Sequence, residues 1–131
     1  MFRPIFTSLL LVLSLTGAAR AGDGALGVWL TEVDRKGLQS HIRIRACGAK
    51  LCGRIVAAFD AAGAKVVTAN IGKELFWDLE PQGGGLYENG RVWLPLVNLR
   101  GAASMWFVGA KLKVRACKGP VCATQIWTRV R

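Results

Sequence analysis

The chain has 131 residues, with 18 lysines and arginines against eight aspartates and glutamates, and its formal net charge is +10. This length is enough for one domain with a modest core and excludes a large multidomain protein. The positive charge favours anionic partners, or serves only solubility, and the basic residues form no run of five or six that would indicate a nucleic-acid-binding tail.

The first 21 residues have the features of a cleaved export signal. Arg3 supplies a positive charge, residues 5–15 form an apolar stretch, and Ala19 and Ala21 have the small side chains that a cleavage site requires. We predict cleavage after Ala21, which leaves one domain at residues 22–131 with a net charge of +8, since Arg3 and Arg20 are removed. The apolar stretch is too short for a membrane anchor, no later stretch could span a bilayer, and no cysteine follows the cleavage site to carry a lipid.

Short strands separated by turns make up the first half of the predicted domain. Candidate strands lie at residues 26–31, 41–47, 52–59, 65–68 and 72–77, and the last of these could also be an irregular crossing. Residues 41–47 alternate between apolar and polar side chains, so we expect one face to be buried while Arg43 and Arg45 face water. A flexible loop is predicted at residues 81–85, which contain one proline and three glycines.

The second half continues the same pattern. Asn89-Gly90 predicts a type I′ hairpin turn between strands at 86–87 and 92–94, because both residues tolerate positive φ angles. Pro95 predicts a sheet edge or a bulge, and a hairpin around Gly109-Ala110 precedes a last strand at 124–130. About eight short strands without a helical period predict an all-β fold, and we favour a small antiparallel up-and-down β-barrel over a sandwich, because closure removes exposed edges.

All four cysteines lie in two near-identical segments. Each segment is an alternating strand that ends at a cysteine, and a second cysteine follows after four residues, giving Cys47 and Cys52, then Cys117 and Cys122. An even number of cysteines in an exported domain predicts disulfides. Pairing between the segments would stabilise more, by about 4 against 2 kcal/mol, whereas local pairing needs no docking of the segments. We predict the local pairs Cys47–Cys52 and Cys117–Cys122, and therefore two disulfide-pinned hairpins.

Metal, redox and acid–base chemistry are not indicated. The cysteine spacing is wider than that of zinc knuckles and no C-x-x-C motif occurs, so we expect no metal site and no cofactor. The single histidine, His41, begins a strand and has no catalytic partner at a recognisable spacing, and no two acids suggest a glycosidase pair. We expect no catalytic residues and no enzymatic activity.

Both ends of the domain resemble one bacterial family. Residues 27–32, 42–44, 47–56 and 112–130 are similar to the exported family known as domain of unknown function 2147. The resemblance implies a lipocalin-like barrel that is periplasmic or secreted. Gly27-Val28-Trp29 also looks like the lipocalin G-x-W signature, whose tryptophan closes the barrel floor beneath an arginine from the end of the chain. Arg129 stands at the matching place, which implies a cation–π contact between Trp29 and Arg129.

Tryptophan is the most informative residue type for function. The five tryptophans either fill the core or line a pocket for an apolar or amphipathic ligand. Gln125, Trp127 and Arg129 share one face of the last strand, so an inward Trp127 would bring in polar groups that need partners. A ligand headgroup would be such a partner. We therefore expect Trp93, Trp106, Gln125 and Trp127 to bind the ligand.

Two functions from different classes follow. In the first, the protein carries a small amphipathic or lipid-like ligand inside the barrel, although side chains could also fill a barrel of about eight strands. In the second, it binds an anionic component of the envelope, or a protein, through a basic outer face made of Arg43, Arg45, Lys113 and Arg115. We prefer the first because of the resemblance. Neither involves nucleic acid, and the oligomeric state stays open.

Overall fold

The computed structural model describes residues 2, 4 and 23–131, so the predicted export signal lies almost wholly outside the described residues. A short 3-10 helix, η1 (Asp23–Ala25), precedes the strands. These strands are β1 (Gly27–Leu30), β2 (Gln39–Cys47), β3 (Lys50–Phe59), β4 (Lys65–Val66), β5 (Glu74–Gly83), β6 (Leu86–Leu94), β7 (Leu99–Val108), β8 (Lys111–Lys118) and β9 (Val121–Arg129). In this described part, no helix is long and apolar enough to cross a membrane.

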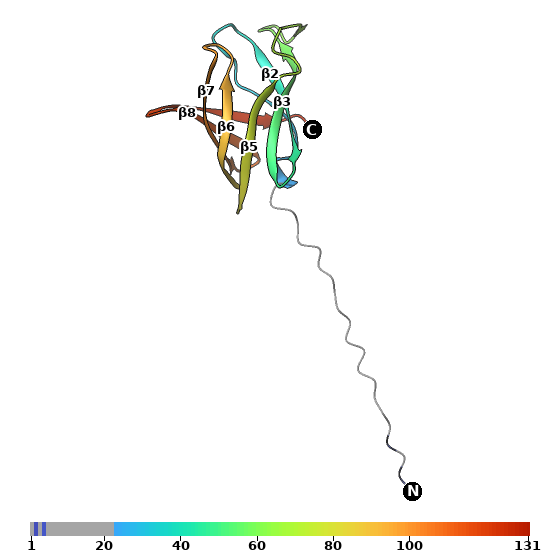
Figure 1. Cartoon of the computed structure of the whole chain (residues 1–131). Coiled ribbons are helices and arrows are strands. Elements are labelled where there is room, and N and C mark those ends of the chain that lie inside the picture. The colour runs from blue at the N-terminus through green and yellow to red at the C-terminus, as the bar shows by residue number, and fades with distance from the viewer. Residues whose placement is uncertain (1, 3, 5–22) are drawn as a thin grey trace.

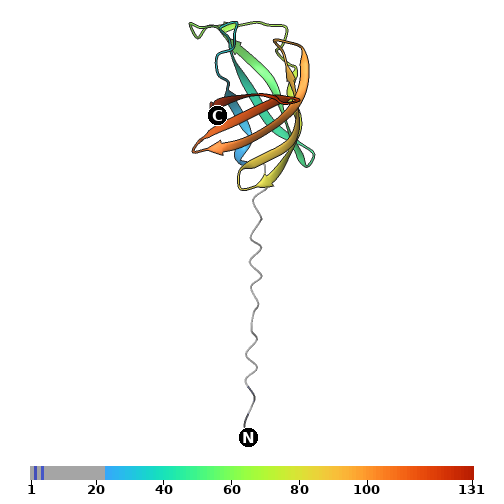
Figure 2. The ribbon, with the colours of Figure 1, turned by 90° about the vertical axis from the view of Figure 1, so that its left-hand side faces the viewer.

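Eight of the described strands close into an antiparallel barrel, which Figure 1 and Figure 2 show from two sides. Neighbours in the sequence are neighbours around the barrel, from β1 through β2, β3 and β5 to β9, and pairing of β9 with β1 closes the ring. The remaining strand, β4, contributes two residues that pair with the end of β3. The prediction of an all-β, up-and-down barrel of about eight strands is confirmed.

Large side chains fill the end of the barrel where η1 lies, called here the floor. Successive residues of a strand point to opposite faces, as β2 shows with a buried Ile42, an exposed Arg43 and a buried Ile44. By the same alternation, several large inward side chains near the floor are at most 1% exposed, among them Trp29, Leu79, Tyr87, Met105 and Leu112. The floor end is therefore a packed core.

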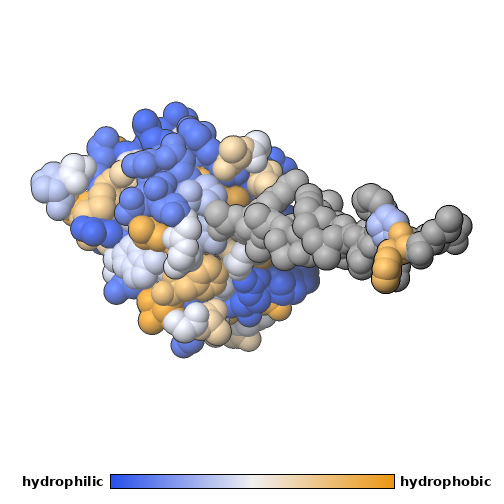
Figure 3. All heavy atoms as spheres, turned by 90° about the horizontal axis from the view of Figure 1, so that it is seen from below, coloured by the Kyte–Doolittle hydropathy of each residue, from blue (hydrophilic) through white to orange (hydrophobic). Residues whose placement is uncertain are grey.

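Trp29 and Arg129 join the first and last strands at the floor. The guanidinium carbon of Arg129 lies 4.3 Å from the centroid of the Trp29 ring, the arrangement that the resemblance implied. Arg129 also donates hydrogen bonds to the carbonyl oxygens of Leu26, at 2.8 Å, and Gly24, while the Trp29 indole donates to the carbonyl of Ala25 at 2.9 Å. These bonds hold η1 beneath the barrel. Figure 3, seen from this end, shows hydrophilic areas mixed with apolar ones.

Both predicted disulfides are present, and they lie at opposite ends of the barrel. Cys47–Cys52 spans the β2–β3 hairpin at the floor end, with 5.9 Å between the Cα atoms, and Cys117–Cys122 spans the β8–β9 hairpin at the other end, with 4.1 Å. Cys117 and Cys122 are direct cross-strand partners, whereas Cys47 lies opposite Lys50, so its bond is diagonal. The two similar cysteine-containing segments lie at opposite ends of the barrel because β2 and β8 run in opposite directions.

The hairpin turn predicted at Asn89-Gly90 is wrong. Both residues lie within β6, and the turn falls at Gly84-Gly85, so the loop expected at residues 81–85 shrinks to that turn. Asn89 does have a positive φ, 60°, but it serves a bulge at which the β6–β7 register shifts. Gly90 is closely packed, since a Cβ there would lie 2.6 Å from Cδ1 of Leu79 and 3.2 Å from the carbonyl oxygen of Ala103.

Candidate functional site

A cavity of about 310 Å³ opens at the end of the barrel opposite the floor. Three segments surround its mouth, at residues 31–38 between β1 and β2, 67–73 between β4 and β5, and 95–98 between β6 and β7. Figure 1 and Figure 2 show them at the top of the barrel. Strands β8 and β9 form one wall. Pockets for small molecules measure about 300 to 1,000 Å³, so this cavity suits a small ligand.

The buried side chains of the cavity lining are all apolar, whereas its polar side chains are half-buried or exposed. The buried lining residues are Ile42, Ile55, Ala58, Val92, Val114 and Trp127. The polar lining residues are Thr31, Glu32, Asp34, Lys36, Ser40, Thr68, Asn70 and Gln125. This separation matches a ligand with an apolar body and a polar end.

Trp127 and Gln125 connect the apolar and polar parts. Trp127 is 3% exposed and lies near Phe76, with 6.4 Å between the ring centroids. Its indole N–H donates a hydrogen bond of 2.8 Å to the side-chain oxygen of Gln125. Because an indole N–H can only donate, it fixes the orientation of the amide and leaves the amide NH₂ group to donate elsewhere. Since Gln125 lines the cavity, that group is in place to bind an acceptor on a ligand.

Trp93 lies at the mouth and contacts two of the surrounding segments. Its indole N–H donates to the side-chain oxygen of Asn98 at 3.0 Å, and the ammonium of Lys73 lies 5.2 Å from its ring centroid. Asn98 belongs to the β6–β7 turn and has a φ of 50°, so this hydrogen bond ties the turn to its own strand. The ring of Trp93 therefore joins the cavity wall to the mouth.

Trp106 lies outside the cavity lining, in contrast to the expectation. It is on the outer face of β7, where the ammonium of Lys113 lies 5.6 Å from its ring centroid, while its neighbour Met105 faces the core. Arg129 lies at the floor, so it cannot reach a headgroup at the mouth. Of the four expected ligand-binding residues, the structure brings together Trp93, Gln125 and Trp127.

The β1–β2 segment contributes lining residues that the sequence did not single out. The carboxylate of Asp34 accepts hydrogen bonds from the backbone N–H groups of Lys36, at 2.8 Å, and Leu38, at 3.0 Å. The carboxylate of Glu32 accepts the backbone N–H of Ile126 at 2.8 Å, beyond the point where β1 stops pairing with β9. Both acids therefore hold the segment over the cavity. The sequence could have indicated the role of Asp34, because aspartate followed by Gly37 is typical of a turn. It could not have indicated the role of Glu32, whose hydrogen-bond partner is 94 residues away.

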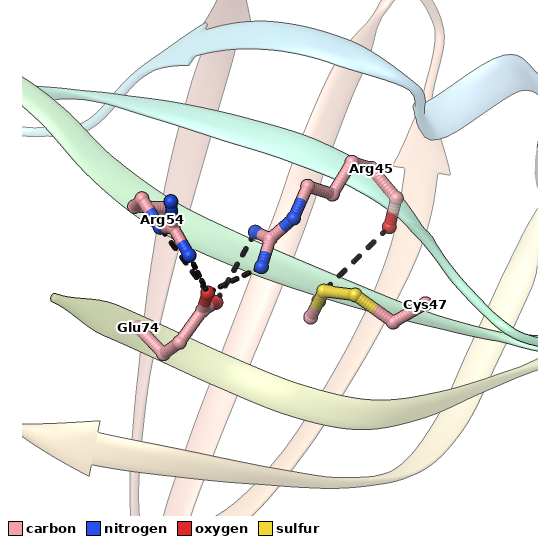
Figure 4. A network of polar contacts seen from close by, with 5 residues as sticks. Arg45, Cys47, Arg54 and Glu74 are labelled. Atoms are coloured by element: carbon pink, nitrogen blue, oxygen red, sulfur yellow. Dashed lines mark hydrogen bonds and ion pairs between the residues drawn. A yellow bond between two sulfur atoms is a disulfide. The ribbon is translucent and has the colours of Figure 1, made fainter. Parts of the chain in front are cut away.

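The outer wall carries a network of charges around Glu74. Figure 4 shows Arg45 from β2 and Arg54 from β3 converging on Glu74 at the start of β5, with a distance of 3.2 Å from Nη1 of Arg45 and 3.0 Å from Nη2 of Arg54. Burial opposes ionisation of this carboxyl, but the hydrogen bonds from Arg45 and Arg54 outweigh it and hold the pKa of Glu74 below its ordinary value of 4.5. Arg45 is thus paired with an acid and adds little to a basic outer face.

His41 lies on the outside of β2 and does not line the cavity. Its ring packs against Phe59, with 4.5 Å between the centroids. Burial and the positive charges of Arg131 and Lys65 lower the pKa of His41 below 6.5. Within the described residues, no three His, Cys, Asp or Glu side chains are grouped so that they could hold a metal ion.

A family model matches residues 27–129, which is most of the chain. The chain belongs to the DUF2147 family. That family is described as uncharacterised proteins conserved in bacteria, so membership in DUF2147 carries no activity with it. The matched stretch contains every residue of the cavity lining. No curated protein sequence matches the chain significantly.

A solved structure shows the same fold as this DUF2147 protein. Protein HP1028 from the human pathogen Helicobacter pylori, described as belonging to the lipocalin family, is similar with a TM-score of 0.65. The likeness covers 81% of this chain and 82% of that chain at 14% sequence identity. At that identity it shows the fold alone. The DUF2147 chain is therefore a lipocalin-like barrel.

Proposed function

We propose that this DUF2147 protein binds a small amphipathic or lipid-like ligand in the barrel cavity. The observation that carries the proposal is the cavity itself, about 310 Å³, with buried apolar side chains and half-buried or exposed polar ones in its lining. The lipocalin-like fold is consistent with a ligand inside the barrel, although it does not specify one. The two disulfides support a periplasmic or secreted protein, because disulfides persist in oxidising compartments.

The polar end of the ligand is a hydrogen-bond acceptor in this proposal. Glu32 and Asp34 both accept backbone N–H groups, so their carboxylates are engaged in holding the β1–β2 segment. Two lining groups are donors in place for a ligand, namely the amide NH₂ of Gln125 and the ammonium of Lys36, for which no ion pair is found among the described residues. A carboxylate, carbonyl or phosphate would match these donors.

Binding of a fluorescent fatty acid, cis-parinaric acid, to the disulfide-bonded mature protein tests the proposal. Ala116→Phe places a ring into the cavity lining and should abolish binding, whereas Ala102→Phe makes the same change on the exposed outer face of β7 and should leave it unchanged. Gln125→Leu should weaken binding about tenfold, since a hydrogen bond to a charged group is worth about 1.5 kcal/mol. Equal binding of cis-parinaric acid by the Ala116→Phe and Ala102→Phe variants would refute a site inside the barrel.

The alternative function, docking of an anionic surface or a protein on the basic outer face, has less support. Arg45 is ion-paired with Glu74, and Lys113 lies over Trp106. Arg115 is directed at the sulfur of Cys122, 3.4 Å away. Three of the four basic side chains expected on that face therefore have partners on the barrel itself.

A further inference from the structure

The mouth of the cavity carries exposed aliphatic side chains on every segment that surrounds it. Residues 31–38, 60–73 and 95–100 are called here the rim. The exposed large apolar residues of the rim are Val33 (57%), Val67 (95%), Leu96 (44%), Val97 (54%) and Leu99 (45%). Elsewhere in residues 23–131 the comparable side chains are Val108 at the end of β7, Val121 at the start of β9 and Val130 after β9. Single exposed valines are ordinary, but their concentration at one end of a barrel is not.

The same rim presents positive charge to solvent. Its basic residues are all exposed, and they are Arg35, Lys36, Lys65, Lys73 and Arg100. Its three acids are Glu32, Asp34 and Asp60, and each accepts backbone N–H groups within the fold. Asp60, for example, accepts the N–H groups of Ala62 and Ala64, both at 2.9 Å. Five basic residues against three acids leave the rim with a net charge of +2.

We propose that the rim docks onto the surface of an anionic phospholipid bilayer, with the mouth of the cavity facing the membrane. In this arrangement Val67 and the other aliphatic tips enter the headgroup region, and the lysines and arginines beside them bind phosphate groups. Apolar insertion and electrostatic attraction act together at such surfaces. Long basic side chains also suit the boundary, because their stems lie in apolar surroundings while their charges stay in the polar layer.

A bilayer fits the rim better than a protein partner does. The aliphatic side chains are spread over three segments, with Val33 on the first, Val67 on the second and a cluster of Leu96, Val97 and Leu99 on the third, and each of these segments also carries exposed lysines or arginines. A stable protein interface buries about 800 Å² on each partner and is depleted in lysine. Apolar tips that share their segments with exposed basic residues instead match the headgroup region of an anionic bilayer, which accepts both kinds of side chain.

This inference deepens the proposed function, because a docked mouth would let a lipid-like ligand pass between the bilayer and the cavity. The physical docking itself does not require a ligand. It is therefore measured without one, and binding of cis-parinaric acid is measured separately without vesicles. If the protein docks onto vesicles but does not bind cis-parinaric acid, the cavity site is refuted and the rim is supported. If it binds cis-parinaric acid but does not dock onto vesicles, only the rim is refuted.

Co-sedimentation of the disulfide-bonded mature protein with vesicles tests the docking. We expect binding to vesicles of phosphatidylglycerol and phosphatidylethanolamine, weaker binding as salt rises, and none to phosphatidylcholine alone. Val67→Glu should weaken binding about tenfold, whereas Val108→Glu, an equally drastic change at the floor end, should not. Lys65→Ser should weaken it about fivefold, and Arg43→Ser on the barrel wall should have a smaller effect.

Three results would overturn the proposal. The first is no sedimentation with phosphatidylglycerol vesicles at low salt. The second is an equal loss of binding in Val67→Glu and Val108→Glu, since the rim would then have no special part. The third is that the protein sediments as a dimer without lipid and that Val67→Glu makes it a monomer. The rim would then bind a second copy of the chain and not a membrane.

Discussion

Replacing Arg129 by methionine should destabilise the closure of the barrel more than its surface position suggests. β9 pairs with β8 through seven residue pairs but with β1 through only two, Trp29 with Arg129 and Leu30 with Thr128. The side chain of Arg129 reinforces this short seam through the ring of Trp29 and two carbonyl oxygens beyond it. Methionine keeps much of the apolar stem and removes all three interactions.

The expected loss follows from those interactions. A cation–π contact at an exposed site is worth about 0.5 to 1 kcal/mol. Each hydrogen bond contributes about 0.5 to 1.5 kcal/mol, and we take the low end because Arg129 is exposed. Together these give about 1.5 to 2 kcal/mol. At about 4 °C per kcal/mol for a domain of this size, the melting temperature should fall by about 6 to 8 °C.

Thermal unfolding followed by circular dichroism, with the disulfides intact, measures the effect. Arg129→Lys should recover about half of the loss, because lysine keeps the charge over the ring but not the fork of donors. Arg43→Met is the control, since Arg43 is an exposed arginine on the wall for which no ion pair is found among the described residues, and it should stay within about 2 °C of the native chain. A fall of the same size in both methionine variants would show that the seam does not depend on Arg129.

Three further changes test other parts of the barrel. Because the pKa of Glu74 is lowered, its network stabilises the fold above pH 4.5 and loses that contribution as pH falls through the folded pKa, so Glu74→Gln should flatten the dependence of the melting temperature on pH between 3 and 5. Gly101→Ala should cost roughly 2 kcal/mol or more in urea unfolding, because its Cβ would lie 2.2 Å from the carbonyl oxygen of Cys117; an unchanged urea midpoint would contradict that packing. Replacing Cys117 and Cys122 by serine should cost roughly 2 kcal/mol in the same assay, since the bond closes a short loop, and a loss near 4 would point to a larger effect than loop entropy.

Local patterns predicted most of the strands correctly. Alternation placed β2, and repeated cysteine spacing identified the β2–β3 and β8–β9 hairpins with their disulfides. Both signals act between residues close in sequence, where the chain itself keeps the partners together. The Asn89-Gly90 prediction failed because a positive φ angle is compatible with a turn and with a bulge, and only pairing with β7 selects the bulge.

The candidate site was predictable in part for the same reason. Trp127 and Gln125 were expected together because they share a face of one strand, and the cavity contains both. Trp106 was expected there too, but the phase of β7 points it outward against Lys113. A shift of one residue in register reverses which side chains enter a barrel, and register depends on partners far away in sequence.

The sequence by itself determined the class of this protein: short alternating strands, two local cysteine pairs and a tryptophan near the first strand specify a closed, disulfide-bonded β-barrel. Only the tertiary structure decided that the two similar hairpins lie at opposite ends, that large side chains fill the floor and that a cavity remains at the mouth. The physical reason is that strand periodicity is encoded by neighbours, whereas interior volume depends on how side chains from all eight strands meet in space.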